Sequence, residues 1–148
     1  MQEREATQAL CQEICLGCAM AGTSIRALTR RAKEKRIALD LNELRHAYAA
    51  LEAAAERMLR ESGGRPRKAD VPRAADCVTI YARTMFDRRP ARLAGIVLTG
   101  FSKGGAKLEE TLAANPDASR EAKALCRRVL AEQRRWEGKF QKYCRARR

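Results

Sequence analysis

The sequence predicts an all-α fold, because three features of the chain favour helices over strands. Ala, Leu, Arg, Lys and Glu dominate its 148 residues, whereas Val, Ile and aromatic residues are few. Apolar residues recur at spacings of three and four, the period of a helix with one buried face. Turn-forming residues divide the chain into four long helices and one short one. A chain of this length suits one domain, so residues 1–148 are predicted to form a single bundle.

The first helix is predicted over about residues 4–36, and it ends in the basic run RRAKEKR, which suits a helix C-terminus. Its expected buried face consists of Leu10, Ile14, Gly17, Cys18, Ala21, Ile25 and Leu28. The second helix is predicted over about residues 39–62, with Asp40 or Asn42 as its N-cap. Its expected buried face consists of Leu41, Leu44, Tyr48, Leu51, Ala55, Met58 and Leu59.

A connection without a long helix separates the second helix from the third long one. Gly63 and Gly64 are expected to stop the second helix, and residues 63–72 form the one clear linker. A short helix is predicted over about residues 73–86, with Val78, Tyr81 and Met85 on one side. The linker is too short to separate two domains.

The central helix is predicted from Pro90 to about Ala114, because Pro suits the first position of a helix. It holds the longest apolar run of the chain, residues 93–98. Its expected inner face consists of Leu93, Ile96, Val97, Gly100, Gly104, Leu108 and Thr111. Glycine costs about 1 kcal/mol against alanine inside a helix. We therefore predict that Gly100 and Gly104 mark the closest approach of a neighbouring helix.

The last helix is predicted over about residues 118–144, after the turn Asn-Pro-Asp, with Asp117 as its N-cap. Its expected buried face consists of Ala122, Leu125, Cys126, Val129, Gln133, Trp136, Phe140 and Tyr143. Gln133 lies at the centre of this face and needs a hydrogen-bond partner, for which Tyr48 and Tyr81 are the candidates.

Four segments of the chain carry a resemblance to a known family. They read LCQEICLGCAMAGTSI, GGRPRK, TMFDRRPARLAGIVLTGFSKGG and LCRRVLAEQRRWEGKFQKY. With the helix order, these segments resemble an uncharacterised clostridial family of ferritin-like four-helix bundles, a domain of unknown function. The resemblance implies a ferritin-like bundle with an extra short helix between the second and third long helices. It implies no activity.

A di-iron centre of the ferritin type needs inward Glu residues and two Glu-x-x-His strings. The chain has one such string, Glu43 to His46, and a helical wheel places both residues outside the buried face. In the last helix Arg135 stands where a ligand His is needed after Glu132. We therefore expect no di-iron site, no other cofactor and no catalytic residue, because Ser and Thr also lack a His partner.

The six cysteines are expected to be reduced thiols that are mostly buried. Cys11, Cys15 and Cys18 form a row on the first helix, and thiolates of this kind suit Cu(I). Buried free cysteine also packs as a small apolar residue, which is the favoured interpretation here. A metal-handling protein that uses this row remains the alternative function.

The formal net charge of +13 predicts acidic partners, such as nucleic acid or an acidic protein. If the connection of residues 63–89 returns the chain to the end where the second helix begins, three basic clusters meet at one end of the bundle. In a plain up-down bundle they scatter to both ends. The clusters consist of Arg30, Arg31, Lys33, Lys35, Arg36, Arg88, Arg89, Arg92, Arg145, Arg147 and Arg148.

These observations together predict a non-enzymatic binding or structural module with a basic end for polyanions. No run approaches the roughly 20 apolar residues of a membrane span, and the start MQEREATQ is polar. We therefore expect a cytoplasmic protein. The identity of its partner and a homo-oligomeric state are left open by the sequence.

Overall fold

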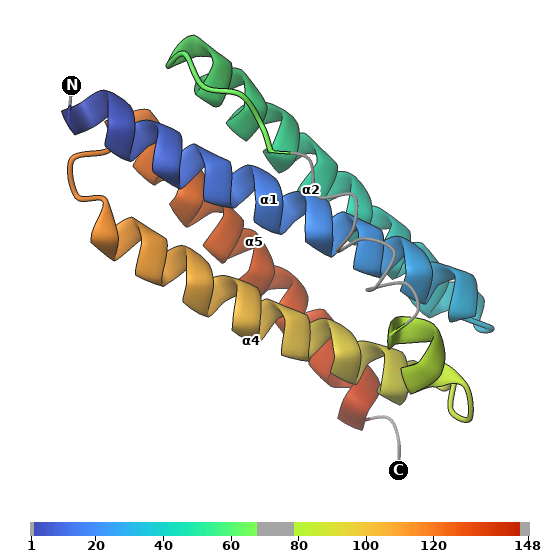
Figure 1. Ribbon diagram of the computed structural model, residues 1–148. Coiled ribbons are helices and arrows are strands. Elements are labelled where there is room, and N and C mark those ends of the chain that lie inside the picture. Colours follow the sequence, from blue (N-terminus) through green and yellow to red (C-terminus); the bar gives the residue numbers. More distant parts are fainter. Residues whose placement is uncertain (1, 68–78, 146–148) are drawn as a thin grey trace.

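The computed structural model describes residues 2–67 and 79–145, and every regular element in these ranges is a helix. The predicted all-α class is therefore confirmed (Figure 1). Residues 79–84 form a short helical segment before the third long helix. The four long helices are α1 (Gln2–Arg31), α2 (Lys35–Glu61), α4 (Pro90–Ala114) and α5 (Arg120–Arg145).

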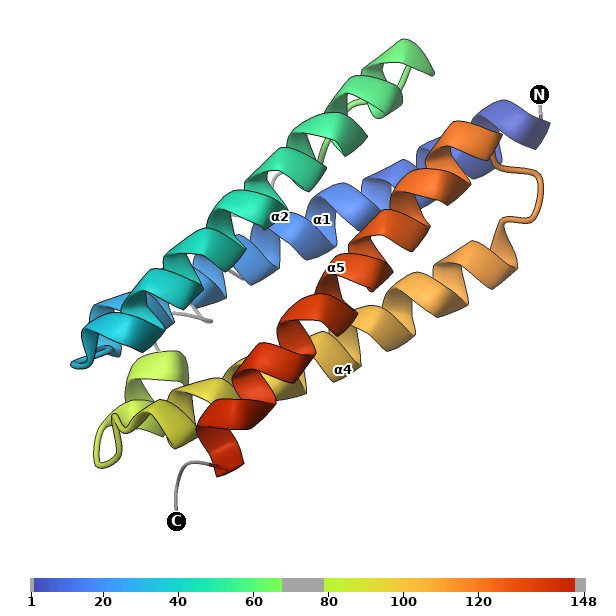
Figure 2. The same cartoon turned by 180° about the vertical axis from the view of Figure 1, so that it is seen from behind.

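The long helices form a bundle in which α2 and α4 run in the same direction (Figure 1). α1 runs away from the N-terminus, α2 returns antiparallel to it, and α4 begins again at the end where α2 began. α5 then runs antiparallel to α4. Each of α1 and α5 packs on both α2 and α4, and the two also contact each other (Figure 2). This arrangement excludes the plain up-down bundle.

The buried faces of α1, α2 and α5 are largely those predicted. Gly17, Ala21, Met58 and Tyr143 are only partly buried, and the other predicted residues lie in the core. A row of aromatic rings crosses the core from α2 to α5 through Phe101 of α4. Its ring centroids lie 6.4 Å apart for Tyr48 and Phe101, 6.3 Å for Phe101 and Phe140. The helical period therefore suffices to identify these three faces.

The break between α1 and α2 lies earlier than predicted, because α1 ends at Arg31 and α2 begins at Lys35. The basic run therefore spans a helix end, a connection and the first turn of the next helix. The predicted N-caps of α2 are wrong, because Asp40 and Asn42 lie inside the helix. Glu34 occupies the cap position, and its side chain makes no capping hydrogen bond.

The predicted N-cap of α5 is also wrong, because Ser119 takes the role given to Asp117. The Ser119 hydroxyl accepts a hydrogen bond from the Ala122 N–H at 3.1 Å, the pattern of a side-chain N-cap. The Ser119 N–H in turn donates to the Thr7 hydroxyl at 2.8 Å. This bond joins the start of α5 to the first turns of α1, which explains why the helix begins after Asp117.

Gly63 ends α2, as predicted. Its φ is +89°, a left-handed conformation that glycine adopts readily. The Gly63 N–H donates to the Arg60 carbonyl at 2.9 Å, and the Gly64 N–H donates to the Leu59 carbonyl at 2.8 Å. These bonds satisfy carbonyls that the end of a helix leaves without partners.

The predicted close contact at Gly100 is wrong, because Gly100 is exposed and a Cβ built there meets no atom within 4 Å. The closest approach lies at the buried Gly105, where a Cβ would lie 2.9 Å from Gln133 Oε1. A Cβ at Gly104 would lie 3.6 Å from Gln133 Nε2, an ordinary contact. The inner face of α4 is therefore rotated towards Phe101 and Gly105, which are buried.

The buried side of the short helix also differs from the prediction. Tyr81 and Met85 are exposed, whereas Ile80 and Thr84 are buried. Val78 lies outside the described residues. The guanidinium group of Arg31 donates to the Thr84 hydroxyl at 3.0 Å and to its carbonyl at 3.2 Å. These bonds draw the Ile80 and Thr84 side of the segment onto the bundle.

Candidate functional site

The basic residues predicted to meet at one end of the bundle do meet there (Figure 1). They lie at the end of α1, in the connection to α2, in the first turn of α2, around the start of α4 and at the end of α5. We call this surface the basic pole. It consists of Arg30, Arg31, Lys33, Lys35, Arg36, Arg88, Arg89, Arg92 and Arg145. Arg147 and Arg148 lie outside the described residues.

Two arginines of the basic pole hold its segments together. Arg88 Nε donates to the Arg31 carbonyl at 2.7 Å, which satisfies a carbonyl at the C-terminus of α1. The Arg31 guanidinium group binds Thr84 and lies over the Tyr81 ring, 4.6 Å from its centroid. Both arginines therefore have structural partners, and their positive charges remain at this end of the bundle.

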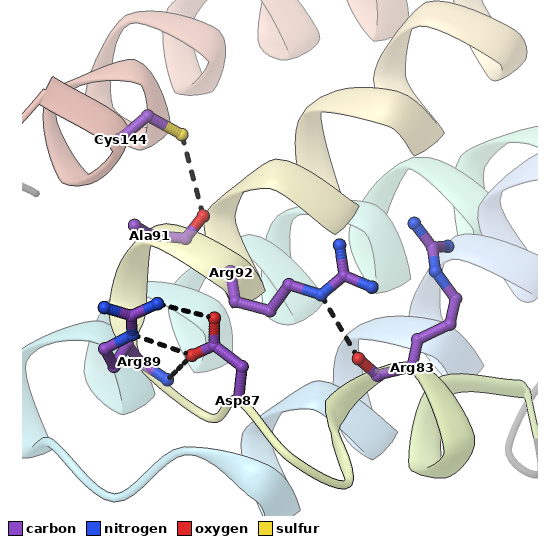
Figure 3. Close-up of polar contacts among 6 residues, drawn as sticks. All are labelled: Arg83, Asp87, Arg89, Ala91, Arg92 and Cys144. Carbon is purple, nitrogen blue, oxygen red and sulfur yellow. Dashed lines mark hydrogen bonds and ion pairs between the residues drawn. The ribbon is translucent and has the colours of Figure 1, made fainter.

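The segment before α4 adds three further contacts (Figure 3). Arg89 pairs with Asp87, with Nη2 2.9 Å from Oδ2, and the pair is partly exposed. Arg92 Nε donates to the Arg83 carbonyl at 3.1 Å. The Cys144 thiol donates weakly to the Ala91 carbonyl at 3.8 Å, which places the end of α5 beside the start of α4.

Tyr143 joins the end of α5 to α2. Its hydroxyl donates to Asp40 Oδ2 at 2.5 Å, and the Arg36 guanidinium lies 6.0 Å from its ring centroid. Burial, together with the hydrogen bond to Asp40, raises the pKa of Tyr143 to about 12. The phenol therefore stays neutral and keeps donating at physiological pH.

A hollow of about 520 Å³ lies in the basic pole, between the start of α2 and the start of α4. It is lined by three cations, two carboxylates, Phe86 and Pro90: Lys33, Arg88, Arg89, Glu34, Asp87, Phe86 and Pro90. Phe86 is 96% exposed, more than any other large apolar side chain among the described residues. Helical periodicity does not single out this residue. The signal that was present is its place immediately before the basic stretch Asp-Arg-Arg-Pro.

Several cations of the basic pole are not neutralised. Arg30, Lys33, Lys35 and Arg145 are exposed, and none forms an ion pair with any described residue. Three carboxylates lie at or beside this surface: the exposed Glu34, and Asp40 and Asp87, which bind Tyr143 and Arg89. The surface therefore presents a positive field together with several free N–H donors.

The thiol row of α1 gives less support to a metal site. Cys11, Cys15, Cys18 and Cys126 are buried and Cys144 is partly buried, all as free thiols. Cys77 lies outside the described residues. Burial raises the pKa of Cys11 to about 11 and that of Cys15 and Cys18 to about 12, so these groups are neutral at physiological pH. In the described part of the chain, no three His, Cys, Asp or Glu residues are grouped to hold a metal ion.

The residues considered for a di-iron centre lie away from the core, as the helical wheel predicted for Glu43 and His46. Both are exposed on α2. Glu132 of α5 accepts hydrogen bonds from Trp136 Nε1 and from Arg135 Nη2, each at 3.0 Å. Its carboxylate therefore serves the packing of Trp136 at the edge of the core.

Gln133 is the polar residue at the centre of the bundle, and it is only 8% exposed. It hydrogen-bonds Tyr48 of α2, one of the two partners that the sequence offered. Burial raises the pKa of Tyr48, so the phenol is neutral. This pair satisfies two buried polar side chains and joins α2 to α5.

The comparisons with known proteins found no match among family models, curated proteins or solved structures. Among the described helices, none has the length and apolar character needed to cross a membrane.

Proposed function

We propose that this chain is a non-enzymatic binding module whose basic pole binds single-stranded nucleic acid through its phosphates. The observation that carries the proposal is the joining of three separate basic segments at one end of the bundle. Like charges repel, so the fold gains nothing from placing them together. A polyanionic partner compensates for this repulsion.

The chemistry of the basic pole favours phosphate. Six of the seven arginines at its described positions keep a guanidinium group that forms no ion pair with a described residue, because only Arg89 is paired. The planar guanidinium fork matches phosphate oxygens, and the lysines add point charges. Neutralising several phosphates releases condensed counterions, which makes such binding strongly salt-dependent.

The exposed Phe86 favours a single strand over other polyanions. It lies in the same hollow as Lys33 and Arg89. These cations are therefore placed to bind the phosphates on either side of a base that stacks on the Phe86 ring. Stacking on an aromatic side chain contributes about 1–3 kcal/mol per base in proteins that bind single strands. A highly sulfated chain such as heparin has the charge but no base to stack.

The test compares two variants of equal net charge. In the pole variant, Lys33→Glu, Lys35→Glu and Arg145→Glu reverse three exposed charges of the basic pole. In the control variant, Arg120→Glu, Arg127→Glu and Arg128→Glu reverse three exposed charges near the opposite end of the bundle. Each variant falls from +13 by six charges, to +7.

Fluorescence anisotropy with a labelled oligothymidylate at low salt gives the readout. We expect the pole variant to bind at least about tenfold more weakly than the control variant, because only the former loses phosphate contacts. Equal weakening in both variants contradicts the proposal, since net charge alone then explains binding. Failure of the wild type to bind, with capture of an acidic protein instead, favours a protein partner.

We also infer a ferritin-like bundle and a cytoplasmic location. The parallel course of α2 and α4, which requires a long connection between them, supports the ferritin-like topology. Five free cysteines among the described residues are typical of a reducing compartment. Mass spectrometry of the freshly isolated protein, after alkylation without reductant, tests the second inference.

A further inference from the structure

A cleft of about 450 Å³ opens between α1 and α4 and reaches the core of the bundle. Its walls come from these two helices and from residues 79–83, and the buried residues Tyr48, Val129 and Gln133 line its inner part. The volume lies within the range of small-molecule sites in proteins. Among the described residues, none lines both the cleft and the hollow of the basic pole.

Two glycines lie on the walls of this cleft. Gly17 of α1 and Gly100 of α4 both line it, and a Cβ at either position would meet no atom within 4 Å. Glycine in a helix interior costs about 1 kcal/mol against alanine. In the described part of the chain no atom of another helix lies within 4 Å of either Cβ position, so close packing does not offset that cost. A leucine side chain at either position would therefore occupy part of the cleft.

The cleft is elongated. Along α1 it extends from Glu13 to Leu28, which is about 22 Å at 1.5 Å per residue. Most of its lining is apolar, including Ile25, Val97 and Phe101. An extended apolar chain therefore fits its shape and its surface better than a compact polar molecule does.

The charges along the cleft are mainly positive. Burial raises the pKa of the Glu13 carboxyl, and the positive charge of Lys107 offsets part of this rise. Arg83 and Lys103 line the cleft and form no ion pair with any described residue. The Arg83 guanidinium points away from Asp87 (Figure 3). These two cations complement an anionic group on the bound molecule.

We propose that the cleft binds an elongated amphipathic anion of the fatty-carboxylate class. The apolar chain lies along Gly17 and Gly100, and the carboxylate is bound by a cation at one end of the chain, Arg83 or Lys103. The carboxylate group accepts charge-assisted hydrogen bonds from that cation. This site is independent of the nucleic-acid interface proposed for the basic pole.

The first experiment fills the cleft. Calorimetric titration with decanoate, at a salt concentration that suppresses binding to the basic pole, compares wild type with Gly100→Leu and Gly17→Leu. The matched control is Gly138→Leu on α5, where a Cβ also meets nothing within 4 Å but which does not line the cleft. We expect folded proteins with unchanged or higher melting temperatures, and loss of decanoate binding in the two cleft variants only.

The second experiment tests the carboxylate. Replacing Arg83→Gln and Lys103→Gln together should weaken decanoate binding at least about tenfold and leave the binding of decanol nearly unchanged. The pole variant should bind decanoate as the wild type does. The proposal is overturned if wild-type protein does not bind decanoate, if both cleft-filled variants bind it as well as Gly138→Leu does, or if decanol binds as tightly as decanoate.

Discussion

At Gly105 the backbone of α4 lies so close to Gln133 that an added Cβ would be 2.9 Å from its amide oxygen. Gly105→Ala therefore forces Gln133 away from Tyr48, whereas Gly100→Ala places a methyl group in open space. We expect Gly100→Ala to raise the free energy of unfolding by about 0.5–1 kcal/mol, because alanine favours the helix. The free energy of unfolding of Gly105→Ala should be at least about 1 kcal/mol lower than that of Gly100→Ala. Urea denaturation measures both, and equal values would show that Gln133 moves without cost.

The exposed ring of Phe86 carries a second prediction at this scale. Phe86→Ala should weaken binding of oligothymidylate by roughly 5-fold or more, because a stacked base loses about 1–3 kcal/mol. Heparin affinity should stay the same, since heparin offers no base. The control is Leu39→Ala, which removes another exposed apolar side chain near the start of α2. Equal losses for heparin and oligothymidylate would refute a stacking role.

The thiol row of α1 makes the free energy of unfolding depend on pH in the alkaline range. The folded protein holds the protons of Cys11, Cys15 and Cys18 up to about pH 11–12, whereas the unfolded chain loses them near 9.0. Between these values the native state binds more protons, so stability falls as pH rises. We expect a flat profile below pH 8, then a loss approaching about 1.4 kcal/mol per pH unit for each thiol. The free energy of unfolding, measured by denaturant melts at each pH, should fall less steeply with pH in Cys18→Ala than in the wild type. An unchanged dependence on pH would contradict the burial of this thiol.

The elements also show which features local sequence can predict. The bounds of α4 match the prediction because Pro90 and the Asn-Pro-Asp turn are local signals. The break after Arg31 was missed because the residues around it favour helix, and contacts from Arg88 and Thr84 help to hold the chain there. The glycines of α4 were misjudged, since a helical wheel gives a face but not the distance to its neighbour.

At the scale of the whole molecule, the connection between α2 and α4 is long enough to bring the basic segments to one end, but the sequence left a plain up-down bundle open. In the structure, α4 starts beside the end of α1 (Figure 1). The hollow around Phe86 and the cleft between α1 and α4 were not predicted. Both depend on which side chains the tertiary packing leaves uncovered, and helical periodicity carries no such information.

The salt dependence of oligothymidylate binding tests the central claim most directly. The affinity of a single strand falls with salt at a logarithmic slope of about 0.7 per phosphate neutralised. Wild type and the control variant should show the same steep slope of log affinity against log salt concentration. The slope of the pole variant should be smaller by about 2, because three phosphate contacts disappear. Identical slopes for the pole and control variants would contradict binding at the basic pole.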